Sequence, residues 1–150
     1  MKNSNQNQTY DGMDFAILMR IGEKEQQYRQ EAHTGTRCEL LNAYGEAADY
    51  AQKNGASYDE IFSWREKACV LAENGVQTEP CFISCWDAAV VCINCGNLAQ
   101  SHSRNQEARG WFKKAAAYLE RIQEEQMRSP VDGCDVPALL RQVYAVLASM

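Results

Sequence analysis

Apolar residues recur every three or four positions in successive segments of the chain. The clearest series comprises Ala108, Trp111, Phe112, Ala115, Leu119 and Ile122. This spacing places the apolar side chains on one face of an α-helix. The composition agrees, because 19 alanines outnumber the 18 Val, Ile and Thr residues combined, and alanine favours helices over strands. The sequence therefore predicts an all-α fold.

Capping signals divide these segments into about six antiparallel helices joined by short connectors. A first helix is expected over about residues 14–31, packing through its apolar N-terminal half alone. The other helix starts are expected at Thr36, Ser57, Thr78, Ser103 and Asp135, and helix ends at Asn54-Gly55 and Asn74-Gly75. Residues 1–11 are polar and predict a flexible leader, and residues 12–150 a single domain. The two histidines, His33 and His102, lie near expected helix ends, where a His side chain interacts favourably with a helix C-terminus.

The chain contains an internal similarity at an offset of 47 residues. Residues 64–68 and 111–115 match at Trp, Lys and Ala, and each segment falls in the second helix of an expected pair. Two helical hairpins of one design in series favour a short solenoid-like stack over a closed bundle.

The second pair resembles a tetratricopeptide repeat over about residues 89–122. The resemblance depends on Gly96, Ala108, Phe112 and Ala115, which follow that family's spacing of small and aromatic residues. It implies a close approach of two antiparallel helices with the aromatic side chain between them. Cys92 stands where the family usually has a large aromatic residue.

The same resemblance implies a concave groove formed by the first helix of each pair. The groove positions are Val90, Ile93, Asn97 and Gln100 in the second pair and Ala43, Glu46, Tyr50 and Lys53 in the first. Such a groove binds a peptide, with amide side chains hydrogen-bonding its backbone. The alternative is an ordinary solvated face. Trp86 is the aromatic residue that we most expect to contact a partner, because it points away from the neighbouring cysteines.

Four cysteines, Cys81, Cys85, Cys92 and Cys95, share one face of an expected helix. We interpret them, with Ala88 and Ala99, as a stripe of small residues in a packed helix seam. The alternative is metal or redox chemistry, in which either Cys92 and Cys95 or Cys81 and Cys85 share an ion with outside ligands such as Cys69, Cys134 or His33. The whole stripe rises about 21 Å, too far for one metal ion.

The formal net charge of −5 and the dispersed basic residues argue against nucleic-acid binding. The N-terminus has no apolar core of a signal peptide, and the apolar run over residues 88–95 is too short to span a bilayer. We therefore expect a cytoplasmic protein without membrane contact. No catalytic triad or phosphate-binding loop is present, and no enzymatic activity or cofactor is predicted.

These observations predict a non-catalytic protein-interaction module, such as an adaptor, chaperone or inhibitor, that binds another protein or peptide. The predicted partner-binding residues are Glu46, Tyr50, Lys53, Trp86, Ile93, Asn97 and Gln100. A homodimer is also compatible with the sequence. The alternative function is a metal- or thiol-responsive helical regulator that uses the helix containing Cys92 and Cys95.

Overall fold

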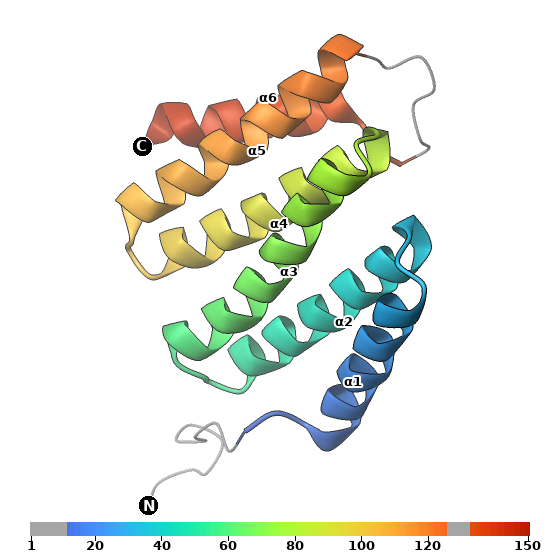
Figure 1. Cartoon of the computed structure of the whole chain (residues 1–150). Coiled ribbons are helices and arrows are strands. Elements are labelled where there is room, and N and C mark those ends of the chain that lie inside the picture. Colours follow the sequence, from blue (N-terminus) through green and yellow to red (C-terminus); the bar gives the residue numbers. More distant parts are fainter. Residues whose placement is uncertain (1–11, 126–132) are drawn as a thin grey trace, which may run out of the picture. The chain divides into compact units, whose positions relative to one another are not determined.

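A computed structural model describes residues 12–125 and 133–150, and within them the chain forms six α-helices (Figure 1). In chain order they are α1 (Phe15–Gln30), α2 (Thr34–Lys53), α3 (Tyr58–Thr78), α4 (Phe82–Ser101), α5 (Asn105–Glu125) and α6 (Val136–Ser149). This confirms the all-α prediction and the arrangement of packed neighbouring helices. The expected leader, residues 1–11, lies outside the described residues.

The helices divide into two compact units, Met1–Ala68 and Cys69–Met150. The first unit contains α1, α2 and the N-terminal half of α3. The second contains the C-terminal half of α3 together with α4, α5 and α6. The expectation of a single domain over residues 12–150 stays a prediction.

Three of the expected helix boundaries are confirmed by their hydrogen bonds and backbone conformation. Ser57 Oγ accepts the backbone N–H of Glu60 at 3.2 Å, one residue before α3 begins. Asp135 Oδ1 accepts the backbone N–H of Ala138 at 3.0 Å at the start of α6. Gly55 follows α2 with φ +79°, the left-handed conformation that glycine adopts without strain.

The two histidines cap opposite kinds of helix end. His102 follows α4, and its Nδ1 lies 3.1 Å from the Leu98 carbonyl oxygen, as expected for a histidine at a helix C-terminus. His33 instead caps the N-terminus of α2, because its Nδ1 accepts the backbone N–H of Gly35 at 3.0 Å. Thr36 is therefore not the first capping residue. Its Oγ1 accepts the backbone N–H of His33 at 3.1 Å and completes the capping box from inside the helix.

The expected end of α3 at Asn74-Gly75 is wrong, because the helix continues to Thr78. The backbone N–H of Glu79 donates to the Gly75 carbonyl oxygen at 2.9 Å, so the helical hydrogen bonds run past the glycine. Gly75 is buried in the second unit. Tertiary packing there outweighs the weak helix propensity of glycine, which amounts to about 1 kcal/mol.

The starts of α4 and α5 are also displaced from their expected positions. The helix expected after Thr78 begins at Phe82, where the backbone N–H of Cys81 donates to Ser84 Oγ at 2.9 Å. Ser103 does not cap α5. It adopts φ +60° in the tight turn after α4, and α5 begins at Asn105.

In the first unit α1 packs on α2 through both of its halves. Ile17 and Ile21 are buried in the apolar N-terminal half. Farther along α1, the carboxylate of Glu25 accepts the hydroxyl of Tyr44 from α2 at 2.6 Å. The expectation that only the N-terminal half packs is therefore wrong, because a polar contact extends the interface.

In the second unit the stripe of small residues on α4 is buried, as the packing interpretation predicted. Its buried members are Cys85, Ala88, Cys92, Cys95 and Ala99, each at most 2% exposed. Cys81 departs from the prediction, because it is exposed at the N-terminal cap of α4.

The helices α4 and α5 form an antiparallel hairpin, with α6 beside α5 (Figure 1). Within this hairpin Gly96 allows the ring of Phe112 to reach the backbone of α4. A Cβ atom at Gly96 would lie 2.8 Å from Phe112 Cζ, shorter than any normal carbon–carbon contact. Phe112 is only 1% exposed, so its ring has little room to withdraw. The close approach of the two helices therefore requires glycine at position 96.

By length and composition, α4 is the one helix of the described chain that is apolar enough to cross a membrane. The apolar segment therefore extends beyond residues 88–95, the run that is too short to span a bilayer. Half of the apolar stretch within Phe82–Ser101 is buried inside the protein.

We predict that Gly96→Ala lowers the free energy of unfolding by up to about 2 kcal/mol. The added methyl group overpacks against Phe112 at a cost of about 1–3 kcal/mol, and a gain of about 1 kcal/mol in helix propensity offsets part of this cost. Chemical denaturation followed by circular dichroism measures the change.

Gly110→Ala on α5 is the matched control, because a Cβ at Gly110 meets nothing within 4 Å. This variant should gain up to about 1 kcal/mol from helix propensity alone. Equal effects of the two substitutions would contradict the role assigned to Gly96.

Candidate functional site

The four predicted binding residues of α4 lie on one face of the helix, opposite its buried small residues. Trp86 and Ile93 are half-buried, whereas Asn97 and Gln100 are exposed. At about 100° per residue these positions fall within a narrow stripe along α4. We call these four residues the α4 stripe. It is apolar toward the N-terminus of the helix and polar toward its C-terminus.

An aromatic pair forms the apolar end of the α4 stripe. The rings of Phe82 and Trp86 are stacked, with centroids 6.3 Å apart and planes 8° apart. Both side chains are half-buried. The stack holds the indole of Trp86 in one orientation, which reduces the conformational entropy lost when a ligand packs against it.

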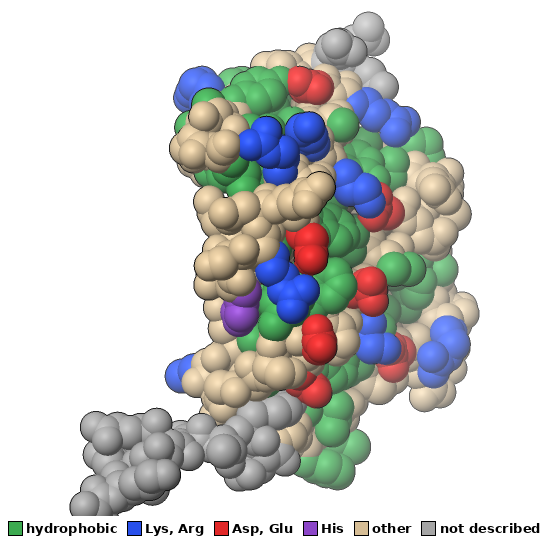
Figure 2. Space-filling view, turned by 90° about the vertical axis from the view of Figure 1, so that its left-hand side faces the viewer, with side chains coloured by type: hydrophobic (Ala, Val, Ile, Leu, Met, Phe, Trp, Pro, Cys, Tyr) green, Lys and Arg blue, Asp and Glu red, His purple; other side chains and the backbone are tan. Residues whose placement is uncertain are grey.

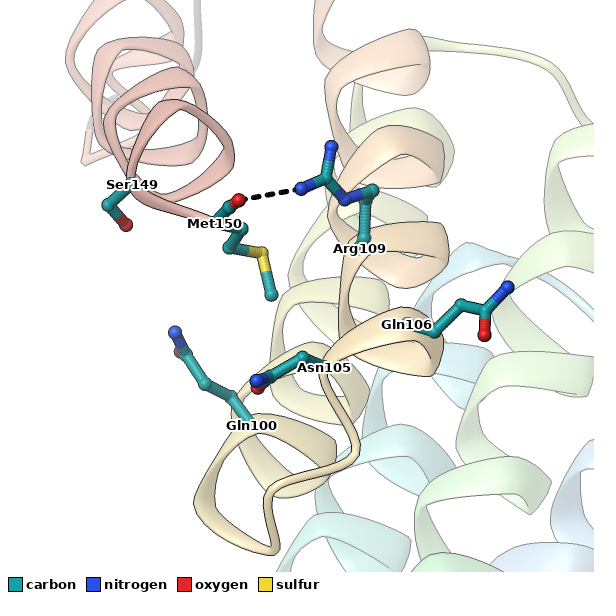
Figure 3. Close-up of a pocket in the computed structure, with 6 residues that line it drawn as sticks. All are labelled: Gln100, Asn105, Gln106, Arg109, Ser149 and Met150. Atoms are coloured by element: carbon teal, nitrogen blue, oxygen red, sulfur yellow. Dashed lines mark hydrogen bonds between the residues drawn. The ribbon is translucent and has the colours of Figure 1, made fainter.

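A pocket lies at the polar end of the α4 stripe, within the second unit (Figure 3). Its volume is about 370 Å³, and it is lined by Gln100, Asn105, Gln106, Arg109, Ser149 and Met150. Arg109 Nη2 donates to the Met150 carbonyl oxygen at 2.8 Å, which joins α5 to the end of α6. Figure 3 shows the Met150 side chain directed from the end of α6 toward Gln100 and Asn105, with Gln106 directed away from them. Gln100 belongs to both the pocket and the α4 stripe.

Apart from Gln100, the pocket residues are not among those that the sequence pattern points to. Three come from the first turns of α5 and two from the end of α6. The start of α5 and the end of α6 come together only when the second unit folds. The spacing of residues in the sequence therefore does not predict this pocket.

The three predicted binding residues of the first unit share one face of α2. Glu46 is engaged by Arg20 of α1, whose Nε and Nη2 donate to Glu46 Oε1 at 2.9 and 2.6 Å. Tyr50 is half-buried, and Lys53 is exposed. Glu46 therefore already holds α1 against α2, whereas Lys53 presents its charge to solvent.

A polar cluster centred on Glu73 lies elsewhere in the second unit, where α3, α4 and α5 meet. The carboxylate of Glu73 accepts the hydroxyl of Tyr118 at 2.6 Å and the ammonium of Lys114 at 3.3 Å. The Cys69 thiol donates to Glu73 Oε1 at 3.1 Å. Burial, together with the hydrogen bond to the Glu73 carboxylate, raises the pKa of Tyr118 above its ordinary value.

Cys69 on α3 and Cys92 and Cys95 on α4 are buried. Hydrogen bonding with the thiols of Cys92 and Cys95 lowers the pKa of Cys69, whereas hydrogen bonding with Cys69 and burial raise the pKa of Cys92. Of the three outside partners considered for Cys92 and Cys95, the structure places Cys69 against them.

All seven cysteines lie in the described part of the chain, and none of them forms a disulfide. Among the described residues, no three His, Cys, Asp or Glu side chains are arranged to hold a metal ion.

Charged side chains are interspersed by sign on the face of the molecule that Figure 2 displays. Ion pairs form within each unit, between Arg65 and Asp49 at 2.8 Å in the first and between Lys114 and Glu73 at 3.3 Å in the second. A nucleic-acid site in contrast concentrates positive charge on one surface.

Comparison of the chain with protein-family models, curated proteins and solved structures found no match. The resemblance to a tetratricopeptide repeat and the roles of the predicted binding residues therefore stay predictions.

We predict that Tyr118→Phe lowers the free energy of unfolding by about 1–2 kcal/mol at pH 7, because it removes a hydrogen bond to a carboxylate. The raised pKa means that the folded protein favours the neutral phenol. The stabilisation is therefore fully present below pH ~10 and is lost as the pH rises above that value. Denaturation of both proteins at several pH values should show the difference between them shrinking above pH ~10.

A Glu73→Gln background provides the control for this prediction. Without the carboxylate, Tyr118→Phe should cost less and its effect should depend less on pH. An identical cost and pH dependence in both backgrounds would show that Glu73 is not the cause.

Proposed function

We propose that the protein is a non-catalytic interaction module, such as an adaptor, chaperone or inhibitor. In this proposal it binds a segment of another protein along the α4 stripe. The observation that carries the proposal is the position of Gln100. It ends the α4 stripe and also lines the pocket between the start of α5 and the end of α6. An anchored aromatic residue and a polar pocket thus lie at the two ends of one helix face.

The dimensions and chemistry of this surface suit a short peptide segment. From Trp86 to Gln100 the helix rises about 21 Å, which is the length of about six extended residues. The indole of Trp86 offers a rigid apolar contact of the kind that dominates binding energy at interfaces. Asn97 and Gln100 offer amide donors and acceptors for the ligand backbone.

The tetratricopeptide-like arrangement of two hairpins is part of the proposal, and the Trp residues support it. Lys67 Nζ lies 5.9 Å from the ring centroid of Trp64, and Lys114 Nζ lies 5.1 Å from that of Trp111. The offset of 47 residues thus relates two equivalent cation–π contacts, one in each unit. Equivalent sequence positions make equivalent local contacts.

A second pair of positions at the same offset supports the arrangement further. Gly96 and Phe112 pack together in the second unit. The residues 47 positions earlier are Asp49 and Arg65, and they form an ion pair of 2.8 Å in the first unit. The same two positions therefore join the helices of each hairpin, by close packing in one and by charge in the other.

We predict that Trp86→Ala and Asn97→Ala each reduce partner capture by about tenfold or more, as expected for hot-spot residues. The experiment immobilises wild-type and variant proteins, exposes them to extract from the native cell and quantifies the bound proteins by mass spectrometry. Asn97 is exposed on α4, and alanine is a better helix former than asparagine, so this variant should remain folded.

Lys113→Ala is the matched control, since Lys113 is exposed on α5 and is not part of the α4 stripe or the pocket. Proteins specific for the α4 stripe should bind the wild type and this control but be lost from both stripe variants. Equal capture by all four proteins, with circular dichroism showing unchanged helicity, would refute the proposed surface.

A further inference from the structure

An exposed apolar stripe runs along the first turns of α1, on the side opposite the two isoleucines that this helix buries. Phe15 is 75% exposed, Leu18 43% and Met19 60%. At about 100° per residue these three positions and Gly22 fall within an arc of about 100°. We call Phe15, Leu18, Met19 and Gly22 the α1 stripe. Contiguous apolar side chains on a protein surface mark a site of interaction.

Gly22 lies in the middle of α1, where glycine weakens a helix relative to alanine. It is exposed, and a Cβ atom there would meet nothing within 4 Å in the described chain. Packing within the chain therefore does not require glycine at this position. Gly96 shows what a glycine in a helix allows, because the ring of Phe112 lies against the helix backbone there. An aromatic ring from outside the chain would account for Gly22 in the same way.

The α1 stripe is complementary to itself. Phe15 and Gly22 are seven residues apart, a rise of about 10 Å, and Leu18 and Met19 lie midway between them. When two copies of α1 pack antiparallel about a two-fold axis through that midpoint, Phe15 of each copy lies against Gly22 of the other. The side chains at positions 18 and 19 of both copies then meet at the axis. A two-fold interface requires such a surface, which fits a second copy of itself.

We propose that the protein forms a two-fold homodimer through the α1 stripe, with Phe15 of each copy packed on Gly22 of the other. Phe15 exposes roughly 150 Å², because an aromatic side chain presents about 200 Å². With Leu18, Met19 and the polar residues beside them, the two helices bury on the order of 1,000 Å² in total, at the low end of specific interfaces. That area suits a dimer that dissociates on dilution, with a Kd on the order of 10 µM. The surface belongs to the first unit, and the proposal does not depend on the α4 stripe.

The test measures the molecular mass of the full-length protein by sedimentation equilibrium, from about 1 µM to about 1 mM. The wild type should change from monomer to dimer across this range. Phe15→Ala should weaken the dimer about 100-fold, because the two-fold symmetry removes two aromatic contacts at once. Phe15 is exposed in the single chain, so this variant should keep its helicity by circular dichroism.

Gly22→Ala distinguishes a contact between copies from a role within the chain. Alanine strengthens the helix, so Tm measured well below the Kd should rise by about 2–4 °C. The added methyl groups overpack both contacts with Phe15, so the dimer should weaken about tenfold or more. Gly110→Ala is the matched control, since Gly110 is also an exposed helix glycine with open space at its Cβ. It should raise Tm to a similar extent and leave the Kd unchanged.

A double variant tests the pairing of the two positions. Phe15→Gly together with Gly22→Phe exchanges the ring and the glycine, which still face each other across the axis. This protein should dimerise about tenfold more tightly than Phe15→Gly alone, or by a larger factor.

Three results would overturn the proposal. The first is a wild-type protein that stays monomeric at every concentration measured. The second is a dimer whose Kd is the same in Phe15→Ala as in the wild type. The third comes from a photoreactive residue at Met19, if it cross-links within its own chain or to a different protein of the native cell extract and not to a second copy.

Discussion

The contact between Gly96 and Phe112 determines how closely α4 and α5 pack, and the second unit depends on it. Because the Phe112 ring lies against the backbone of α4 at Gly96, the face of α4 that carries the small residues is buried. Because a helix has two opposite faces, burying that side leaves the side with Trp86 and Asn97 partly exposed. The seam of the fold and the proposed binding surface therefore follow from one orientation of α4.

Three hydrogen bonds between a tyrosine and a carboxylate join neighbouring helices. Tyr44 donates to Glu25 and links α2 to α1, Tyr118 donates to Glu73 and links α5 to α3, and Tyr144 donates to Glu120 and links α6 to α5. Burial and then the hydrogen bond to the carboxylate raise the pKa of Tyr44 and of Tyr118, whereas the hydrogen bond to Glu120 is the main cause of the raised pKa of Tyr144. In each pair the neutral hydroxyl is therefore the favoured donor. Glu73 in addition accepts a hydrogen bond from the Cys69 thiol, so this pair also includes a cysteine of α3.

The presence of the helices and the two faces of α4 were predictable from the sequence, because the spacing of apolar residues depends only on positions close together in the chain. The buried positions of Cys92 and Cys95 follow from this local pattern. The end of α3 was not predictable from Asn74-Gly75, since burial of Gly75 outweighs its propensity. The pocket around Arg109 and the Glu73 cluster also escaped prediction, because each joins helices whose meeting no local spacing encodes.

The central claim is that the exposed side of α4 contacts another protein. Photo-crosslinking in the native cell tests it most directly, with a photoreactive residue placed at Asn97 in one protein and at Lys113 in another. The account predicts a discrete cross-linked partner from position 97 that is absent from position 113. No cross-link from position 97, or the same products from both positions, would contradict it.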